Sequence, residues 1–416
     1  MCGSKKSTDV IESHSHRTST PRTPKSPSPQ QQPLPDLSSS SNIFLTDSRS
    51  NKYWSKSSAS SRSSLASLKD SLPENPHIYN FSDIRSATSN FLSDKFSFSS
   101  SSTSWRCIIR NKDVVVFQRK LRRSLELSEL RERLAVICRS HHSSLVKLLG
   151  ASISGNYIYL VYEYVHGVSL GDCLRNRRNP NFTVLSSWLS RMQIATDIAH
   201  GLDYIHHFSG LNSNFIHNHI KSSSIIITEN LSARLCHFGT SELCGEVVGE
   251  GWSGSYSARL KELKRFGSQV TKLAGTRGYM APEIQTTGVA TQKSDVYAFG
   301  VVTLELLSGE EVLKHEFDDG TGSGYRKVSV VATARRALED DGGVRKWVDK
   351  RLKDSFPVEV AKKMIQIGLE CVEEDPNQRP DMGRVAVSVS KLFLESQKWA
   401  EKMGTPIDFS FSMAPR

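Results

Sequence analysis

The sequence predicts an α+β fold in which strands dominate the first half of the folded part and helices dominate the second. Two patterns support this prediction. Apolar and aromatic residues alternate with a strand-like period over 158–164, and over 188–206 the apolar residues recur at the spacing of one long buried helix. With 416 residues, the chain has room for one such domain and its tails, and not for a second large core.

The first 75 residues are rich in Ser, Pro, Gln and basic residues. A segment of this composition buries too little apolar surface to offset the entropy lost on ordering, so we expect a disordered tail over 1–75. Four Ser/Thr-Pro steps in this tail are candidate phosphorylation sites, and the alternative is a solvated linker that its prolines stiffen. The four residues are Thr20, Thr23, Ser26 and Ser28.

Charge and cysteine content limit the classes of partner. The formal net charge of +11 favours acidic surfaces, but basic and acidic residues are interspersed and no nucleic-acid-binding motif accompanies them. We therefore expect no nucleic-acid partner. The seven cysteines are scattered without C-x-x-C pairs, which argues against both a disulfide framework and a zinc site.

The start of the chain bears on its location. No run of about 18 apolar residues occurs, so we expect a cytoplasmic protein that does not span a membrane. Cys2 lies close to Lys5 and Lys6 and is a candidate for palmitoylation, which would give peripheral contact with the inner face of the plasma membrane. Residue 2 is not glycine, which excludes N-myristoylation.

The folded part begins near Tyr79. Apolar residues recur at helical spacing over 81–91, with Ser82 or Asp83 available to cap the helix. A serine-rich segment without glycine follows at 96–105, and residues 113–120 form the next predicted strand. Serines permit a β-hairpin here, but a close backbone cradle around phosphate needs residues without side chains.

Three later motifs resemble those of protein kinases. Residues 217–224 read H-N-H-I-K-S-S-S and resemble H-R-D-x-K-x-x-N, while residues 237–239 read H-F-G and resemble D-F-G. Residues 275–283 read G-T-R-G-Y-M-A-P-E, which is close to the form in plant receptor-like kinases. Residues 297–301 and 307–311 also resemble the lysin-motif receptor kinases. Because no membrane span is predicted, the receptor-like cytoplasmic kinases are the better comparison.

The resemblance covers residues 79–394 and implies a bilobal protein-kinase fold. It implies a small β-rich N-lobe over about 92–162 and a larger helical C-lobe over about 168–394. A C-terminal tail over 395–416 would follow.

The resemblance also shows that the polar chemistry of the family has been replaced. His219 stands where the catalytic Asp belongs, and Ser224 and His237 stand where the two metal-binding residues belong. Phe117 takes the place of the phosphate-binding Lys, and Arg133 that of its Glu partner. Magnesium prefers anionic oxygen, whereas imidazole suits softer metals, and two histidines are too few for a transition-metal site. No bound metal is therefore expected.

Nucleotide binding by a displaced cation is an alternative that the sequence leaves open. The candidate cations are Arg106, Lys112 and Arg119. Of these, Arg119 would share a strand face with Phe117, since strand side chains alternate with period two. The resemblance places the hinge of the nucleotide site at Glu163 and Tyr164. We expect no cofactor, with ATP binding in the absence of magnesium as the alternative.

By contrast, the residues that would hold the C-lobe together are retained. The resemblance implies a buried ion pair between Glu283 and Arg379, and it implies that Asp295 binds the backbone of the catalytic loop. Lys221 of that loop is also retained and would hydrogen-bond Thr276. A folded C-lobe is therefore expected.

The sequence predicts a receptor-like cytoplasmic pseudokinase that acts as a scaffold or allosteric partner. Its expected partners are active receptor-like kinases or other signalling proteins. One alternative is an atypical, weakly active ATP-dependent serine/threonine kinase that uses a displaced cation. Another is a nucleotide-binding switch without catalysis.

Overall fold

A computed structural model describes residues 77–98, 102–211, 214–246, 276–317 and 325–404. The predicted tail over 1–75, with Cys2 and the four Ser/Thr-Pro steps, lies outside these residues. Gly275 and the end of the chain from residue 405 also lie outside them.

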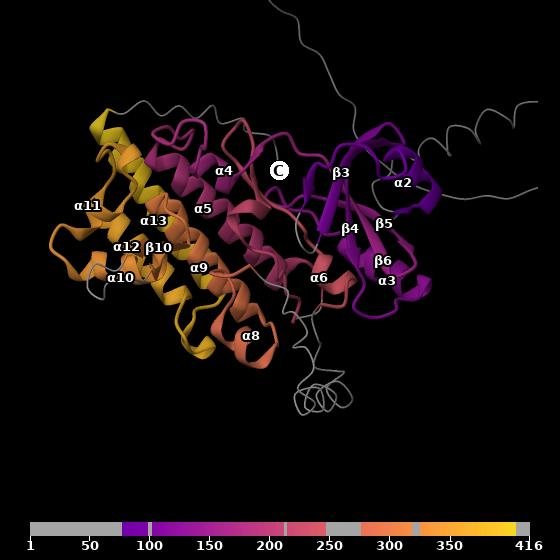
Figure 1. The fold of residues 1–416 in the computed structure, drawn as a ribbon. Coiled ribbons are helices and arrows are strands. Elements are labelled where there is room, and N and C mark those ends of the chain that lie inside the picture. The colour runs from indigo at the N-terminus through magenta and orange to yellow at the C-terminus, as the bar shows by residue number, and fades with distance from the viewer. Residues whose placement is uncertain (1–76, 99–101, 212–213, 247–275, 318–324, 405–416) are drawn as a thin grey trace, which may run out of the picture. The chain divides into compact units, whose positions relative to one another are not determined.

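The first part of the described chain is built on a six-stranded sheet with the strand order β1-β5-β6-β4-β3-β2. Strands β1 and β5 are parallel, and the other neighbours are antiparallel. Figure 1 shows β3 to β6 together with α2 and α3 in the part drawn from indigo to purple. In chain order, the elements are β1 (His77–Ile78), α2 (Phe81–Ala87), β2 (Ser97–Phe98), β3 (Ser102–Ile109), β4 (Lys112–Lys120), α3 (Leu127–Ile137), β5 (Leu148–Ser154) and β6 (Tyr157–Glu163).

Strand β4 divides its side chains between two packed faces. Val114 and Val116 belong to the smaller apolar cluster beneath α2, whereas Phe117 packs against the main core. The period-two alternation of a strand explains this division. Helix α2 begins after Asn80, and neither Ser82 nor Asp83 serves as its cap, since both lie inside the helix.

The second part is mainly helical. Its elements are β7 (Val168–Ser169), α4 (Leu170–Leu174), α5 (Trp188–Asp203), the π-helix η1 (Tyr204–Phe208), the 3-10 helix η2 (Ser222–Ser224), β8 (Ile225–Ile227), β9 (Ala233–Leu235), α6 (Thr240–Leu243), α8 (Pro282–Thr287), α9 (Gln292–Ser308), β10 (Leu313–Phe317), β11 (Tyr325–Ser329), α10 (Val330–Glu339), α11 (Gly343–Trp347), the 3-10 helix η4 (Lys350–Leu352), α12 (Val358–Cys371), the 3-10 helix η5 (Pro376–Gln378) and α13 (Met382–Met403). Strands β7, β8 and β9 form a small antiparallel sheet, and β10 and β11 form a hairpin.

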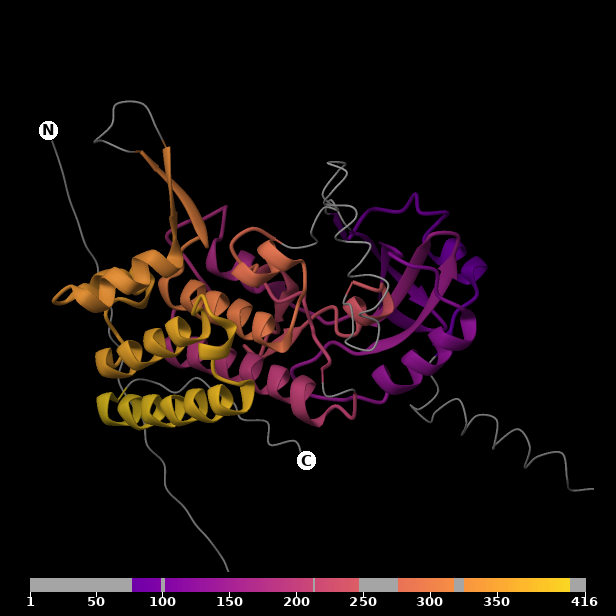
Figure 2. The ribbon, with the colours of Figure 1, turned by 90° about the horizontal axis from the view of Figure 1, so that it is seen from below.

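Helix α9 lies at the centre of the helical part and is buried along most of its length. It contacts α5, α10 and α12, while α13 packs along α5 and α12. Figure 2 shows these helices, from magenta to yellow, running side by side. A helix that is buried on nearly all sides must be covered on each of them. Helices α5, α10 and α12 therefore pack directly against α9. Among the residues placed in the structure, no helix is both long and apolar enough to cross a bilayer.

Helix α13 continues to Met403, whereas the sequence predicts a tail from residue 395. The reason is continued packing, since Ser396 and Ala400 are both buried. Within this last stretch, the Trp188 indole donates a hydrogen bond to the Ser396 hydroxyl at 2.9 Å. That hydroxyl also donates to the Leu392 carbonyl.

We expect Ser396→Ala to destabilise the fold, because it leaves the buried Trp188 N–H without its acceptor. The cost of such an orphaned donor is about 1–3 kcal/mol. Urea unfolding followed by tryptophan fluorescence measures it. Ser390→Ala on the same helix is the matched control, since its hydroxyl contacts His200 in an exposed setting. Equal, small losses in both variants would show that this stretch of α13 does not support the core.

Candidate functional site

The segment from His217 to Gly239 forms a loop, the turn η2 and the hairpin of β8 and β9. Three of its residues other than glycine have a left-handed backbone: Asn218 with φ 61°, Leu231 with φ 58° and His237 with φ 69°. Asparagine tolerates this region, but for histidine it is uncommon and costs free energy. Gly239 follows with φ 82°, and a Cβ there would lie 2.7 Å from the Ile137 Cγ2 atom. Glycine is therefore required at that turn.

Asp295, at the start of α9, holds this loop by its backbone. Its buried carboxylate accepts hydrogen bonds from the N–H groups of His217 at 2.7 Å and Asn218 at 2.8 Å. The Nε2 atom of His206 lies 3.1 Å from the same carboxylate. This is the backbone anchoring that the sequence predicts for Asp295.

His217 is buried and lies beneath the loop. Its Nδ1 atom is 3.3 Å from the N–H of His219, which donates to it. Burial lowers the pKa of His217 to about 4, with Asp295 opposing this effect and His219 and His206 adding to it. The ring is therefore neutral near pH 7 and acts as an acceptor within the loop.

The side chains at the altered positions form an aromatic and imidazole cluster. The Phe117 ring meets the His237 ring edge-on, with centroids 4.7 Å apart, and His237 in turn lies 5.8 Å from the His219 ring. Tyr162 closes the cluster at 5.7 Å from Phe117. Burial, followed by the charge of Arg119, lowers the pKa of His237 well below its usual value. The structure thus brings three of the predicted positions together in one partly buried cluster.

Ser224 is the fourth altered position and is buried in η2. Its backbone carbonyl accepts a hydrogen bond from the Cys236 N–H at 2.9 Å, which ties the loop to the residue before His237. A neutral hydroxyl is all that its side chain offers to a ligand. Its role here is therefore one of backbone connection.

Arg133 lies on α3 and points to the segment after Gly239. Its guanidinium contacts the Glu129 carboxylate at 2.7 Å, and it donates to the Glu242 carbonyl at 3.1 Å as well as pairing with the Glu242 carboxylate. Glu242 belongs to the short helix α6. Arg133 therefore joins α3 to α6, and the altered Phe117 is not its partner.

The three candidate cations have different surroundings. Arg106 is exposed, pairs with Asp113 at 2.6 Å, and stacks over the Tyr164 ring at 3.6 Å. Lys112 is exposed at the start of β4, opposite Ile109, five residues before Phe117.

Arg119, by contrast, is buried and projects from the face of β4 that carries Phe117, as the strand period predicts. Its side chain is only 7% exposed, and it lies 3.8 Å from the carboxylate of Glu246. The candidate hinge residue Glu163 accepts the Lys147 N–H at 3.0 Å and approaches Arg234 at 3.5 Å. Of the three cations, Arg119 alone is buried on the face of the site.

The sequence offered no signal for Glu246. Its carboxylate, with a side chain 6% exposed, lies 2.8 Å from the His219 Nε2 atom. Glu246 thus lies between Arg119 on the sheet and His219 in the loop. Glu246 belongs to no motif of fixed spacing, so the sequence alone could not place it near His219. Only the three-dimensional structure shows this contact.

A second polar network, centred on Glu305, holds the loop at Ser222. Glu305 of α9 is fully buried and lies 2.5 Å from Arg175. The Ser222 hydroxyl donates to it at 2.8 Å, and the Tyr279 hydroxyl donates at 2.6 Å. Burial, followed by the charge of Glu305, raises the pKa of Tyr279 well above its usual value, so the phenol remains a donor.

The predicted contacts of the C-lobe are present. Arg379 donates two hydrogen bonds to the Glu283 carboxylate, at 2.7 and 2.8 Å, and its guanidinium is fully buried. Lys221 Nζ lies 3.3 Å from the Thr276 hydroxyl. The first contact joins α8 to the segment after α12, and the second joins the loop to the start of the described segment at residue 276.

Comparison with known proteins identifies this arrangement. The family described as protein kinase domain matches residues 100–388. The chain belongs to the protein kinase family. The two-lobed kinase fold, with a β-sheet N-lobe and a helical C-lobe, is therefore confirmed.

The relatives include plant receptor-like kinases. LysM domain receptor-like kinase 3 of Arabidopsis thaliana is 32% identical over 332 residues, which cover 78% of this chain and 48% of the relative. PTI1-like tyrosine-protein kinase 1 of the same plant is 32% identical over 270 residues, covering 64% of this chain and 67% of the relative. This chain thus spans about half the length of the LysM relative. The predicted resemblance to plant receptor-like kinases is confirmed.

Among solved structures, the pseudokinase domain of BIR2, an immune regulator of the RLK/Pelle family, is similar to this chain. The TM-score is 0.58 at 25% sequence identity, and the match covers 83% of this chain and 99% of that domain. The fold is therefore shared with a domain described as a pseudokinase.

The kinase family binds magnesium with its nucleotide, and the residues of this site do not fit that metal. Magnesium requires hard oxygen ligands, usually carboxylates. The two metal positions carry His237 and Ser224, and His237 packs edge-on against Phe117. Within the described ranges, no group of three or more His, Cys, Asp or Glu residues is placed to hold a metal ion.

The buried histidines make stability depend on pH. The pKa of His217 is about 4 in the folded protein and about 6.5 when unfolded, so the unfolded state binds more protons between these values. The contribution of neutral His217 to the free energy of unfolding is therefore fully present above pH 6.5 and is lost as the pH falls toward 4. At pH 5 we expect His217 to cost about 2 kcal/mol relative to pH 7.5, with a further loss from His237.

The substitution His237→Asn isolates part of this effect, because asparagine tolerates the left-handed backbone and does not titrate. We expect urea unfolding at pH 7.5 and pH 5 to show a smaller loss of stability for this variant than for wild type. His166→Asn, at an exposed position, should keep the wild-type difference. An unchanged difference in His237→Asn would contradict the neutral, buried state of that ring.

Proposed function

We propose that this chain is a receptor-like cytoplasmic pseudokinase that signals by binding and not by phosphoryl transfer. The observation that carries the proposal is the packed cluster of Phe117, His237 and His219, which fills the positions of phosphate clamp, metal ligand and catalytic Asp. Phosphoryl transfer depends almost entirely on positioning and electrostatic stabilisation of the transferred group. Here several of those contributors are replaced at once.

A weakly active kinase with a displaced cation is the alternative. It would need Arg119 to bind phosphate, because Arg106 is paired with Asp113 and Lys112 lies at the far end of β4. Arg119 faces Glu246 instead. A cation alone would also leave the reaction without a catalytic carboxylate and without magnesium. These features favour the binding role.

We infer that the partners are active receptor-like kinases. The LysM relative is a receptor-like kinase by name, and the contacts that shape the C-lobe are kept while the chemistry of the cleft is not. A C-lobe that keeps its shape can serve as a docking surface for an active kinase. We place this activity in the cytoplasm, with the inner face of the plasma membrane as the site where such receptors and an acylated Cys2 would meet.

We expect the purified protein to show no autophosphorylation and no transfer to a generic acceptor. Radiolabel transfer from ATP, measured with magnesium, tests this. Lys221→Ala is the specificity control, because this lysine is the retained residue of the catalytic loop. Label that persists through purification and disappears in Lys221→Ala would establish the weak kinase instead.

Partner binding should depend on the buried ion pair that holds the C-lobe together. Arg379→Ala leaves Glu283 without its buried partner, which costs about 3–5 kcal/mol. We expect loss of binding to the kinase domain of a LysM receptor-like kinase, measured by calorimetry, and loss of signalling. Arg384→Ala, at an exposed position of α13, is the matched control.

The variant His219→Asp separates docking from catalysis. Restoring the family residue at this one position should change neither partner binding nor signalling much, since the remaining altered positions are untouched. A folded Arg379→Ala protein with full signalling output would overturn the docking role. So would an output that follows the identity of residue 219.

A further inference from the structure

A cavity of about 640 Å³ lies beside the loop that joins α3 to β5, and we call it the α3–β5 cavity. Its volume falls within the range of small-ligand sites, about 300–1,000 Å³. Two cationic side chains line it, Lys147 from the end of the loop and Arg234 from β9. Neither His219 nor His237 is among the lining residues, so the cavity is distinct from the altered cleft.

One carboxylate, that of Glu163 at the end of β6, lies between the two cations. Its Oε1 atom accepts the backbone N–H of Lys147 at 3.0 Å and lies 3.5 Å from Nη1 of Arg234. Arg234 points away from the protein core, because its neighbours Ala233 and Leu235 are both buried and side chains alternate along a strand. The cavity therefore lies on the outer side of β9.

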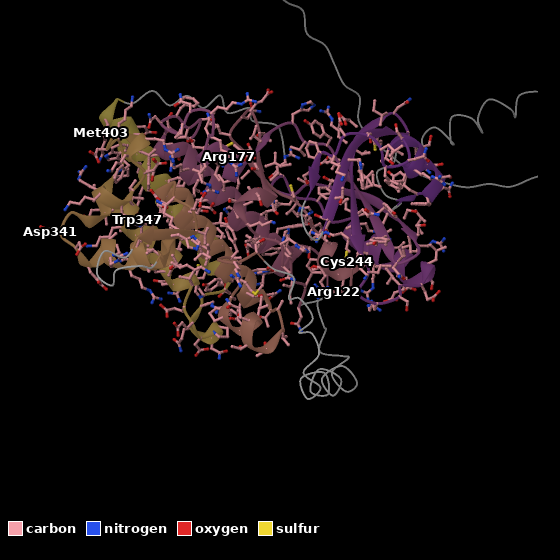
Figure 3. All side chains as sticks on the ribbon, in the orientation of Figure 1. Arg122, Arg177, Cys244, Asp341, Trp347 and Met403 are labelled. Atoms are coloured by element: carbon pink, nitrogen blue, oxygen red, sulfur yellow. The ribbon has the colours of Figure 1, made fainter. Side chains whose placement is uncertain are left out.

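Backbone hydrogen bonds hold the walls of the α3–β5 cavity together. The Val146 N–H donates to the Leu235 carbonyl at 2.9 Å, and the Leu235 N–H donates to the Ser144 carbonyl at 2.8 Å. A further tie between the sheet and the helical part is the hydrogen bond from the Arg122 N–H to the Cys244 carbonyl at 3.1 Å, and Figure 3 labels both residues. A site that is formed before its ligand arrives loses less free energy to ordering when it binds.

Both cations keep capacity for a ligand. Among the residues that the structure describes, none forms an ion pair or hydrogen bond with the Lys147 ammonium group. The Nε atom of Arg234 is buried without a hydrogen-bond partner in the same described ranges, and 35% of the side chain is exposed. Its 3.5 Å approach to Glu163 is longer than a charge-assisted hydrogen bond of about 2.7–2.9 Å. Two cations against one carboxylate leave the cavity with an excess of positive charge.

The loop adds neutral polar groups. His141 lines the cavity, and partial burial, followed by the charge of Lys147, lowers its pKa, while Glu163 opposes this effect. Its imidazole is therefore mostly neutral near pH 7 and offers one N–H donor. Ser143 is exposed on the same loop and also lines the cavity.

We propose that the α3–β5 cavity binds a phosphorylated serine or threonine side chain of a peptide. Such a side chain carries a charge of about −1.5 to −2 near pH 7 and has three strong acceptor oxygens. A planar guanidinium binds two of these oxygens at once, and an ammonium group binds as a point charge. Arg234 and Lys147 supply one group of each kind. Binding here requires neither an inactive cleft nor docking through the C-lobe.

The size and lining of the cavity favour a peptide over a free phosphate ion or a lipid surface. A free phosphate ion would leave most of the 640 Å³ unfilled, whereas residues beside a phosphorylated side chain would occupy it. A lipid surface would gain little, because the apolar lining residues Leu145, Val146 and Phe238 are all buried. Exposed apolar side chains are what insert into a membrane interface.

Calorimetric titration of the full chain with the peptide Gly-Gly-phosphothreonine-Gly-Gly tests the site. We expect the double variant Lys147→Gln/Arg234→Gln to bind at least about tenfold more weakly than wild type, because hydrogen bonds to charged groups are lost. The double variant Arg384→Gln/Lys391→Gln makes the same change in net charge at exposed positions of α13 and should bind as wild type does. An equal loss in both double variants would overturn the proposal.

The variant Glu163→Gln tests the same site by a gain. Its amide oxygen can still accept the Lys147 N–H, while the competing negative charge is removed. We expect the phosphopeptide to bind more tightly than to wild type, and Glu132→Gln, at an exposed position of α3, to show no gain. Circular dichroism establishes which variants fold. If the Lys147→Gln/Arg234→Gln protein unfolds, a folded Glu163→Gln protein without tighter binding rejects the site.

The remaining titrations identify the ligand in wild type. The unphosphorylated Gly-Gly-Thr-Gly-Gly peptide should not bind, and inorganic phosphate should bind more weakly than the phosphopeptide. Equal affinity for inorganic phosphate would reject the peptide, and equal affinity for the unphosphorylated peptide would reject the phosphate. No binding of the phosphopeptide would overturn the site as a whole. So would cosedimentation with phosphatidylserine vesicles that depends on Lys147 and Arg234 in a protein that ignores the phosphopeptide.

Discussion

The backbone contacts of the Asp295 carboxylate are the constraint on which the site depends. This group is buried and accepts the N–H groups of His217 and Asn218, so it sets the path of the loop that carries His219 and Lys221. A buried carboxylate without donors would be costly, and the loop supplies those donors. The loop and the start of α9 therefore stabilise each other, and neither contact involves the side chains that perform chemistry.

Two polar networks hold the helical part, and the first begins in this loop. Ser222 and Tyr279 both donate to Glu305, which lies in the last turn of α9. In the second, Arg379 joins Glu283 of α8 to the segment after α12 through a fully buried guanidinium. Each network brings a buried charge together with its partners, so a change in one member leaves another unsatisfied. The shape of the C-lobe therefore depends on these partners being kept together.

The sequence predicted the frame better than the interior of the cleft. The strand period placed Arg119 on the same face as Phe117, because side chains alternate along a strand. The resemblance to protein kinases implied the contacts of Asp295, Arg379 and Glu283, because the motifs that carry these residues are kept. The sequence could not place Glu246, which reaches His219 through a turn whose length no motif fixes. The predicted start of the tail at residue 395 lies inside α13, because the Trp188 contact that stabilises this part of the helix comes from a segment distant in sequence.

The coexistence of an ordered frame with altered cleft chemistry has a physical explanation. The loop and the helices around it are held largely by side chains that hydrogen-bond to backbone groups. Asp295 accepts from two N–H groups, and Ser241 donates to the Ile216 carbonyl. Arg379 donates to the carbonyls of Lys293 and Glu373. Every residue type carries the same backbone donors and acceptors apart from proline. A carboxylate at position 219 or 237 can therefore be exchanged for imidazole without changing the path of the chain. What changes is the charge inside the cleft.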